Sequence, residues 1–435
     1  MTINRSKIIL FTATMSLFTT ILKVVSLNIS YSIMGLNFLS IELWVGLFFL
    51  SVAVLYPVVY TSTRLGWFYL YIFYTFIVSL SSGGSSSLIT TYQVTSDLGC
   101  ALVLYVVFFE TGNLKTIPRV VYAALFFIMI SCVLNVFGLV RNPFAARAIV
   151  GGSEGLGMAS AYQRMGISGY GFFSGIPPLI PVLVYSYRKA QNVAQKLQFG
   201  VLIGLLMASV FFGSLTAPLL LAIIGLILAI LGVKRLKRGY SIVAISMLVL
   251  VLLFFNPQQL ISSALNRLAD FAPTRDVEIR VRDVAGAVSG DFEATSTSTE
   301  GNSAESRFQR VFWNLEGFSK NPLFGISRAE MPYGSFHLFW LFRLATTGII
   351  GTLPLLGIFF SMTLTNRRKF SASFNYYYLI SMFLFFSMGL VKVIGGWFVY
   401  GVIYFIVPSI YYVTSNNVSS TTGENLANQS ESDTN

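Results

Sequence analysis

The sequence predicts an all-α integral membrane protein that crosses the bilayer about twelve times. Of the 435 residues, 55% are hydrophobic and only 11% are charged, whereas an ordinary soluble domain carries about 25% charged residues. Apolar stretches of roughly 20 residues, the length that crosses a bilayer as a helix, recur along the chain. The basic residues between them fall in alternate loops, as the positive-inside rule predicts.

Twelve apolar stretches are expected to form the transmembrane helices. The expected spans are 8–28, 38–60, 66–82, 97–112, 118–140, 168–187, 197–213, 217–233, 240–256, 337–363, 373–391 and 395–414. The chain is therefore expected to have six regions, which are N-terminal helices (1–140), a first long loop (141–167), central helices (168–256), a second long loop (257–336), C-terminal helices (337–414) and a tail (415–435).

The basic residues at the ends of these stretches predict the orientation of the chain. They occupy alternate loops, at Arg5, Arg64, Arg119, Arg188, the cluster 234–238 and Arg367. All of these positions lie on one side if both termini are cytoplasmic, and the two long loops then face outward. Because this pattern accounts for much of the +12 net charge, we expect no nucleic acid partner. The acidic tail, rich in Ser, Thr and Asn, is typical of a disordered segment.

The first long loop carries an excess of arginine. Arg141, Arg147 and Arg164 are accompanied by a single acidic residue, Glu154. The loop is rich in glycine, and the sequence SGYGFFSG at 168–175 leads into the next helix, which allows close approach of backbone to a ligand. We favour an anion-binding loop. The alternative is that a loop of this length is exported whatever its charge, with its arginines merely solvated.

The second long loop is expected to contain an amphipathic helix near 303–320. Asn302 can cap this helix, and Asn321-Pro322 can end it. Arg307, Arg310 and Asn314 lie together beside an apolar stripe with helical spacing. The apolar residues of that stripe are Phe308, Val311, Phe312, Leu315 and Phe318. Such a helix is suited to lie on a bilayer surface.

His337, the only histidine in the chain, lies where this loop meets the tenth expected span. The first turn of a helix disfavours a charged imidazole, so a neutral His337 is able to act as a general base. Free backbone N–H groups at the helix start can hold a phosphate oxygen, and the guanidinium forks of Arg307 and Arg310 match phosphate geometry. The alternative is an interfacial histidine with an ordinary structural hydrogen bond.

Arg343 lies six residues after His337, inside the same expected span. A charge within a span is costly and tends to face a cavity or a partner, which makes Arg343 a candidate for the site. Snorkelling to the membrane interface explains it equally well. The sequence contains no nucleotide-binding or clustered metal-binding motif. We therefore expect no metal and no cofactor, with any transfer reaction using a donor that is already activated.

These residues carry a resemblance to a known family. The segment 306–327, SRFQRVFWNLEGFSKNPLFGIS, is similar to an arginine-containing helix that ends in an Asn-Pro-Leu-x-Gly turn. His337 is followed by Leu338, nine further residues, and then Gly348-Ile349-Ile350-Gly351. Both features resemble the O-antigen polymerase and O-antigen ligase superfamily of bacterial envelope enzymes. Leu338 departs from that family, which has a polar residue there.

The resemblance implies a glycosyltransferase of the bacterial inner membrane that works at the periplasmic face. Its substrate would be an oligosaccharide linked through pyrophosphate to undecaprenol, and the reaction would invert the anomeric carbon. His337 would activate or position the acceptor, Arg307 would stabilise the pyrophosphate charge, and Arg147 and Arg164 would bind donor phosphates or sugars. Membrane lipid, a chain-length regulator and a flippase are the other partners that the resemblance implies.

Three functions are compatible with these observations. A polymerase adds the glycan to another lipid-linked repeat, and a ligase of the same superfamily adds it to lipid A core. We prefer the polymerase because its histidine motif and both of its arginine-containing loops can be matched to positions in this sequence. A transporter of lipid-linked oligosaccharide is the third candidate, but the sequence shows no repeated halves, which transporters commonly have.

Overall fold

The computed structural model describes most of the chain. The described residues are 5–22, 32–33, 36–37, 40–81, 85–111, 113–142, 145, 161–213, 216–235, 266–267, 269–270, 278, 281–282, 304–332, 336 and 338–414. The chain divides into two compact units, one formed by residues 1–230 and 350–435 and the other by residues 231–349.

The described residues are mostly helical, so the predicted helical class is confirmed. A hairpin of two-residue strands, β1 (Ser32–Ile33) and β2 (Leu36–Asn37), is the one β element among them. The helices are α1 (Arg5–Ile21), α3 (Ile41–Leu55), α4 (Gly66–Ser81), α5 (Ser85–Glu110), α6 (Ile117–Arg141), α9 (Tyr170–Lys189), α10 (Val193–Phe212), α11 (Thr216–Arg235), α15 (Ala304–Lys320), α16 (Phe339–Lys369), α17 (Ala372–Val391) and α18 (Trp397–Gly401). The helix that starts with α18 continues through a π-helical turn at Val402–Ile406 and ends at Thr414.

Among the described residues, five helices are long and apolar enough to cross a membrane. They are Leu114–Arg141, Val193–Phe212, Phe339–Lys369, Ala372–Val391 and Trp397–Thr414. Two shorter apolar helices, Ile41–Leu55 and Ala217–Leu231, accompany them. The expected span 240–256 lies outside the described residues. The count of twelve spans and the sidedness of the loops and termini stay predictions.

Three expected spans differ from the helices that form. The α-helix of the expected span 38–60 ends at Leu55 and is followed by the 3₁₀ helix Pro57–Thr61. The expected span 97–112 is the second half of a longer helix, because α5 already begins at Ser85. The expected span 337–363 is interrupted, because Gly348 in α16 has φ 59° and ψ −168°. That backbone region is essentially restricted to glycine. Residues 339–347 therefore form a separate helical segment before the remainder of α16.

Side-chain caps fix the starts of three helices. The Leu43 N–H donates to Ser40 Oγ at 3.0 Å at the start of α3, and the Gln195 N–H donates to Asn192 Oδ1 at 2.7 Å at the start of α10. Ser371 caps α17 in the same way. Each cap satisfies a backbone N–H that has no partner within the helix. These polar residues explain why the helices begin at the edges of the apolar stretches.

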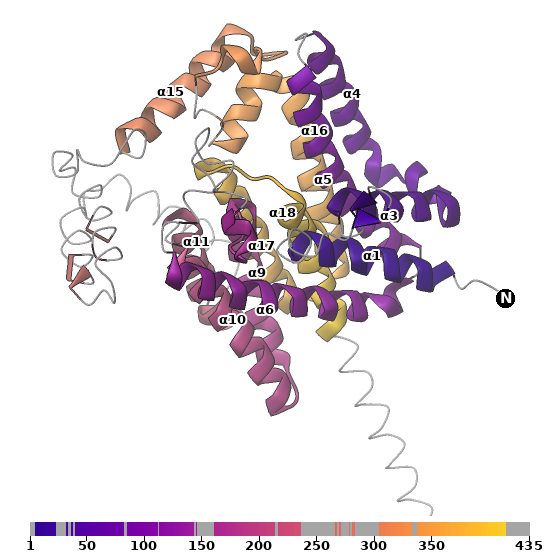
Figure 1. Ribbon diagram of the computed structural model, residues 1–435, viewed down its shortest axis with the longest axis vertical. Helices are drawn as coiled ribbons and strands as arrows, with labels where there is room; N and C mark the ends of the chain where they lie inside the picture. Colours follow the sequence, from indigo (N-terminus) through magenta and orange to yellow (C-terminus); the bar gives the residue numbers. More distant parts are fainter. Residues whose placement is uncertain are drawn as a thin grey trace, which may run out of the picture. The chain divides into compact units, whose positions relative to one another are not determined.

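Helix α9 forms the centre of the first unit and packs against α17, α10 and α18 (Figure 1). All of its residues from Phe172 to Ser186 are buried. It contains three prolines, at 177, 178 and 181, each of which removes one backbone hydrogen bond. A helix that is buried on all sides is held by packing with its neighbours, which explains why this proline-rich segment remains helical.

Candidate functional site

In the second unit, α15 packs closely through Gly317. A Cβ atom at this position would lie 2.8 Å from Met331 Sδ, 3.1 Å from Ile326 Cδ1 and 3.4 Å from Ala345 Cβ. The missing side chain thus brings α15 against the segment after its own end and against residues 339–347. The position of α15 agrees with the amphipathic helix expected near 303–320.

The turn formed by residues 321–325 docks against the break in α16. The Ile326 N–H donates to the Ala345 carbonyl oxygen, and the Ile349 N–H donates to the Pro322 carbonyl oxygen, both at 2.9 Å. Gly325 has φ +78° and lies against the backbone of residues 346–348. These hydrogen bonds satisfy backbone groups that the break removes from the helical pattern. The Asn-Pro-Leu-Phe-Gly segment therefore acts here as a clamp on residues 345–349.

Arg343 lies on the short helical segment that this clamp positions. Its Nε is buried and has no hydrogen-bond partner in the part of the chain that the structure describes. Its Cζ lies 5.5 Å from the centroid of the Phe339 ring, within cation–π range. A buried guanidinium nitrogen without a partner is costly, so this position favours an anionic ligand.

Arg328, in the 3₁₀ helix Arg328–Glu330, is exposed and lies near enough to Arg343 for the charge of Arg343 to act on it. Partial burial, followed by the positive charge of Arg343, lowers the pKa of the Arg328 guanidinium. Neither arginine forms an ion pair with an acidic residue that the structure describes. Two neighbouring guanidinium groups without such a counter-ion form a candidate site for a phosphate or pyrophosphate group.

The remaining predicted residues of this loop lie on or near α15. Arg310 is half-buried, and its carbonyl oxygen accepts a hydrogen bond from Asn314 Nδ2 at 2.7 Å. Arg307 lies one turn earlier in the same helix. His337 lies outside the described residues. Arg328 was not among the residues predicted from the sequence. The one feature of the sequence that could have pointed to it is its position three residues after Gly325, the last residue of the turn.

The ends of the first long loop meet in the first unit. Arg141, the last residue of α6, and Arg164 are both exposed, and Arg147 lies outside the described residues. Gly138 on α6 packs against Ile167, because a Cβ atom added at Gly138 would lie only 2.5 Å from Ile167 Cγ1. The loop ends are thus side by side, which places the exposed Arg141 and Arg164 on neighbouring segments.

Asn135 fixes the end of this loop to α6. Its Oδ1 accepts a hydrogen bond from the Ser168 N–H at 2.7 Å, and its Nδ2 donates to Ser168 Oγ at 2.8 Å and to the Ser131 carbonyl oxygen at 2.7 Å. The side chain is completely buried. One amide side chain therefore determines where the segment before α9 lies.

We predict that Asn135→Leu lowers the free energy of unfolding by about 1–3 kcal/mol, because the Ser168 N–H loses its buried acceptor. Thermal unfolding in detergent and limited proteolysis between residues 141 and 167 would measure the effect. Asn142→Leu is the matched control, since that amide makes only a 3.4 Å contact with the Gly138 carbonyl oxygen and a 3.9 Å contact with Met165. Equal losses in the two variants would contradict this role for Asn135.

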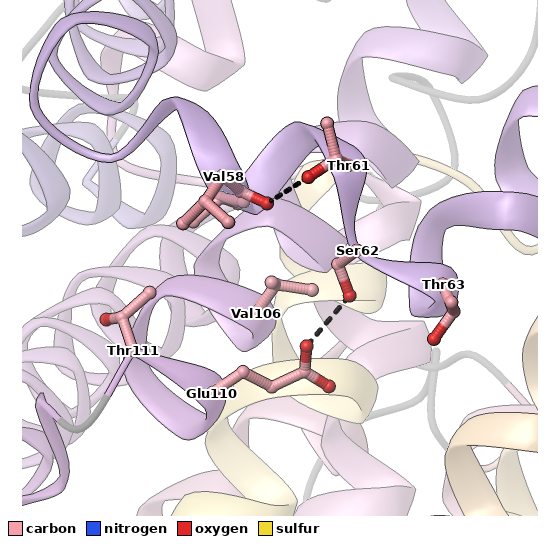
Figure 2. Close-up of a pocket in the computed structure, with 8 residues that line it drawn as sticks. Val58, Thr61, Ser62, Thr63, Val106, Glu110 and Thr111 are labelled. Atoms are coloured by element: carbon pink, nitrogen blue, oxygen red, sulfur yellow. Dashed lines mark hydrogen bonds between the residues drawn. The ribbon is translucent and has the colours of Figure 1, made fainter.

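A pocket of about 300 Å³ beside α5 is a less suitable site (Figure 2). Its carboxylate, Glu110, already has a partner at each oxygen. Glu110 Oε2 accepts from Ser62 Oγ at 2.8 Å, and Oε1 pairs with Arg64 Nε at 3.0 Å. This arrangement is typical of a structural anchor between α5 and the segment 57–65 that precedes α4.

No protein-family model matches the chain, and no curated protein matches it significantly. The family resemblance of residues 306–351 therefore stays a prediction. Among the described residues, no group of three or more His, Cys, Asp and Glu side chains is arranged to hold a metal ion. The arrangement that carries chemistry is the arginine pair, which suits the binding of an anion.

Proposed function

We propose that the protein is a membrane glycosyltransferase that polymerises oligosaccharide repeats linked to undecaprenyl pyrophosphate, yielding O-antigen or a similar surface polysaccharide. The observation that carries the proposal is the neighbouring pair Arg328 and Arg343. Among the described residues the pair has no acidic partner, and the buried Arg343 Nε has no hydrogen-bond partner. Pyrophosphate is an anion that two guanidinium forks can bind through several hydrogen bonds. The family resemblance of the same segment supports this choice of anion.

In the proposed reaction, an acceptor hydroxyl oxygen forms a bond to the anomeric carbon of the donor. The bond between that carbon and the pyrophosphate oxygen breaks, with inversion, and the electron pair leaves with the lipid pyrophosphate. His337 takes the hydroxyl proton as general base. Arg307, Arg310, Arg328 and Arg343 stabilise the charge that develops on the leaving group. Hydrogen-bond donors that are fixed in place before the reaction stabilise such charge most strongly.

The arginines of the first long loop have a binding role in this proposal. Arg141, Arg147 and Arg164 contact phosphates or sugars of the lipid-linked substrates. The reaction takes place at the periplasmic face of a bacterial cytoplasmic membrane. A flippase supplies the lipid-linked repeat there, and a chain-length regulator is a further partner. The protein's own residues perform the transfer without a metal or a cofactor.

The proposal is tested by measuring chain growth with purified protein in lipid vesicles and a lipid-linked repeat as substrate. We expect Arg307→Ala and His337→Ala to abolish the ladder of lengthened glycans on a gel at normal protein levels. Arg368→Ala, an exposed arginine at the far end of α16, should retain the ladder. Unimpaired growth in both site variants would contradict the assignment.

A cell that lacks the protein distinguishes the proposed polymerase from the other candidates. We expect single repeats to remain on the lipid anchor. Long glycan chains without attachment would instead indicate a missing ligase. In vesicles, movement of labelled lipid-linked repeat across the bilayer without lengthening would indicate a transporter.

A further inference from the structure

The first unit contains a cavity of about 270 Å³ that the proposed reaction does not use. Its wall is formed by the last turn of α1, by the start of α3, by α5 and α6, by Gln163 and residues 166–169, by the start of α9 and by residues 395–398. The α1 end and the α9 and α18 starts belong to the side that the positive-inside pattern assigns to the outward face. The cavity thus lies at the end of the bundle where the first long loop is expected.

The polar part of the wall fits a ligand with hydroxyl groups. Asp97, Gln163, Thr20, Ser131 and Ser168 all line the cavity. Thr20 Oγ1 is buried and has no hydrogen-bond partner among the described residues. A carboxylate accepts hydrogen bonds, whereas an amide or a hydroxyl both donates and accepts. Together these groups can bind both the hydrogen and the oxygen of alcohol groups.

The charge of the wall argues against a phosphate ligand. Asp97 is the one charged residue among the described residues that line the cavity. Ionisable side chains inside a membrane bundle are costly and tend to face a cavity or ligand pathway. A negative charge repels phosphate, so this cavity differs in ligand preference from the arginine pair of the second unit. The wall therefore disfavours anions, and its several hydroxyl and amide groups match an uncharged polar ligand.

The apolar part of the wall fits the face of a sugar ring. The ring centroids of Phe172 and Phe398 are 4.9 Å apart, with the planes at 27°, and the buried Trp397 lies beside them on the wall. Glycine lets backbone approach closely at this wall, since a Cβ at Gly171 would lie 2.9 Å from the Gly395 carbonyl oxygen. Aromatic surface opposite a few fixed polar groups is typical of a small-molecule pocket.

The size and rigidity of the cavity limit the ligand further. Its volume is near the lower end of ligand pockets, which is about 300 Å³, and therefore suits a single ring better than a long chain. Asn135 holds Ser168 against α6 through the hydrogen bonds described above. A wall that is already fixed loses little conformational entropy when a ligand binds.

We propose that this cavity binds one uncharged sugar ring, with Asp97 and Gln163 as hydrogen-bonding partners of its hydroxyl groups and the aromatic wall against its apolar face. The inference rests on the proposed function for the choice of a carbohydrate, and it adds a sugar-binding subsite whose affinity does not depend on pyrophosphate. The buried hydroxyl of Thr20 forms a further hydrogen bond with the ligand.

The test is equilibrium binding of a free oligosaccharide to the full-length protein in lipid nanodiscs, with tryptophan fluorescence as the readout of binding. The probe is the reducing oligosaccharide that mild acid releases from the lipid-linked repeat of the source cell. We expect saturable binding, and we expect Asp97→Asn to weaken it about tenfold, because a charged acceptor makes the stronger hydrogen bond. Gln163→Ala should weaken it as well, while Arg368→Gln should leave the affinity unchanged. Thermal unfolding of each variant confirms that it is folded.

The outcomes separate this inference from the proposed function. The sugar subsite would be overturned if the unaltered protein showed no saturable binding. It would also be overturned if the folded Asp97→Asn and Gln163→Ala variants bound the oligosaccharide as tightly as the unaltered protein does. Loss of chain growth in His337→Ala would still support the proposed function in that case. Conversely, absence of chain growth by the unaltered protein, together with a weakened Asp97→Asn affinity, would reject the polymerase while supporting a carbohydrate site.

Discussion

Substitution of Gly325 by alanine is expected to lower the free energy of unfolding by about 4 kcal/mol or more, at the exceptional end for single substitutions. The added Cβ would lie 2.4 Å from the Thr346 carbonyl carbon, 2.5 Å from the Thr347 nitrogen and 2.6 Å from the Gly348 nitrogen. These are backbone atoms, so no side-chain rotation relieves the overlap. The positive φ of 78° adds about 1–2 kcal/mol of strain for a residue other than glycine.

In the Gly325→Ala variant, the turn at 321–325 must therefore move away from residues 345–349 of α16, and the hydrogen bonds with Ala345 and Ile349 are lost. Thermal unfolding in detergent and the rate of proteolysis between residues 321 and 332 would measure this loss. Gly204→Ala in α10 is the control, because a Cβ there meets no atom within 4 Å and alanine is the better helix former by about 1 kcal/mol. Similar stability of both variants would show that the clamp is unimportant.

Replacement of Arg343 by glutamine is expected to reduce glycan chain growth by about 100-fold or more, which is the usual effect of removing one fixed donor to a developing negative charge. Arg343 has a buried Nε without a described partner and lies close to Arg328. Glutamine retains a polar side chain but loses the positive charge. Arg343→Lys should recover part of the activity, because lysine retains the charge without the planar fork.

Chain growth and the affinity for inorganic pyrophosphate should fall together in Arg343→Gln. Arg368→Gln provides the matched control, since it makes the same change at an exposed position in the last turn of the same helix. An Arg343→Gln protein with normal pyrophosphate affinity and normal chain growth would show that this side chain only packs against Phe339.

Much of the secondary structure was predictable from local sequence. The apolar stretch at 118–140 corresponds to α6 (Ile117–Arg141), and the amphipathic pattern near 303–320 corresponds to α15 (Ala304–Lys320). Both agreements have the same reason, which is that the spacing and length of apolar residues are local properties. The residues at the ends are also local, as Ser371 shows by capping α17.

The helix start at Ser85 was not predictable in this way. Residues 85–96 are rich in Ser and Thr, which have a weak preference for helices because their hydroxyls compete for backbone groups. Their hydropathy does not mark a membrane span, yet α5 includes them. Tertiary context overrides such weak local preferences.

The sequence by itself determined an apolar helical protein with an arginine-containing amphipathic helix before a long apolar segment. Only the tertiary structure decided that Gly348 interrupts this segment, since residues 345 and 349 on either side of the break form hydrogen bonds with residues 326 and 322, more than 18 positions away in the chain. The same holds for the approach of Arg328 to Arg343 and for the cavity around Asp97, which gathers residues from Thr20 to Phe398. A pattern of residues specifies local backbone geometry, whereas contacts between distant segments depend on how their surfaces pack.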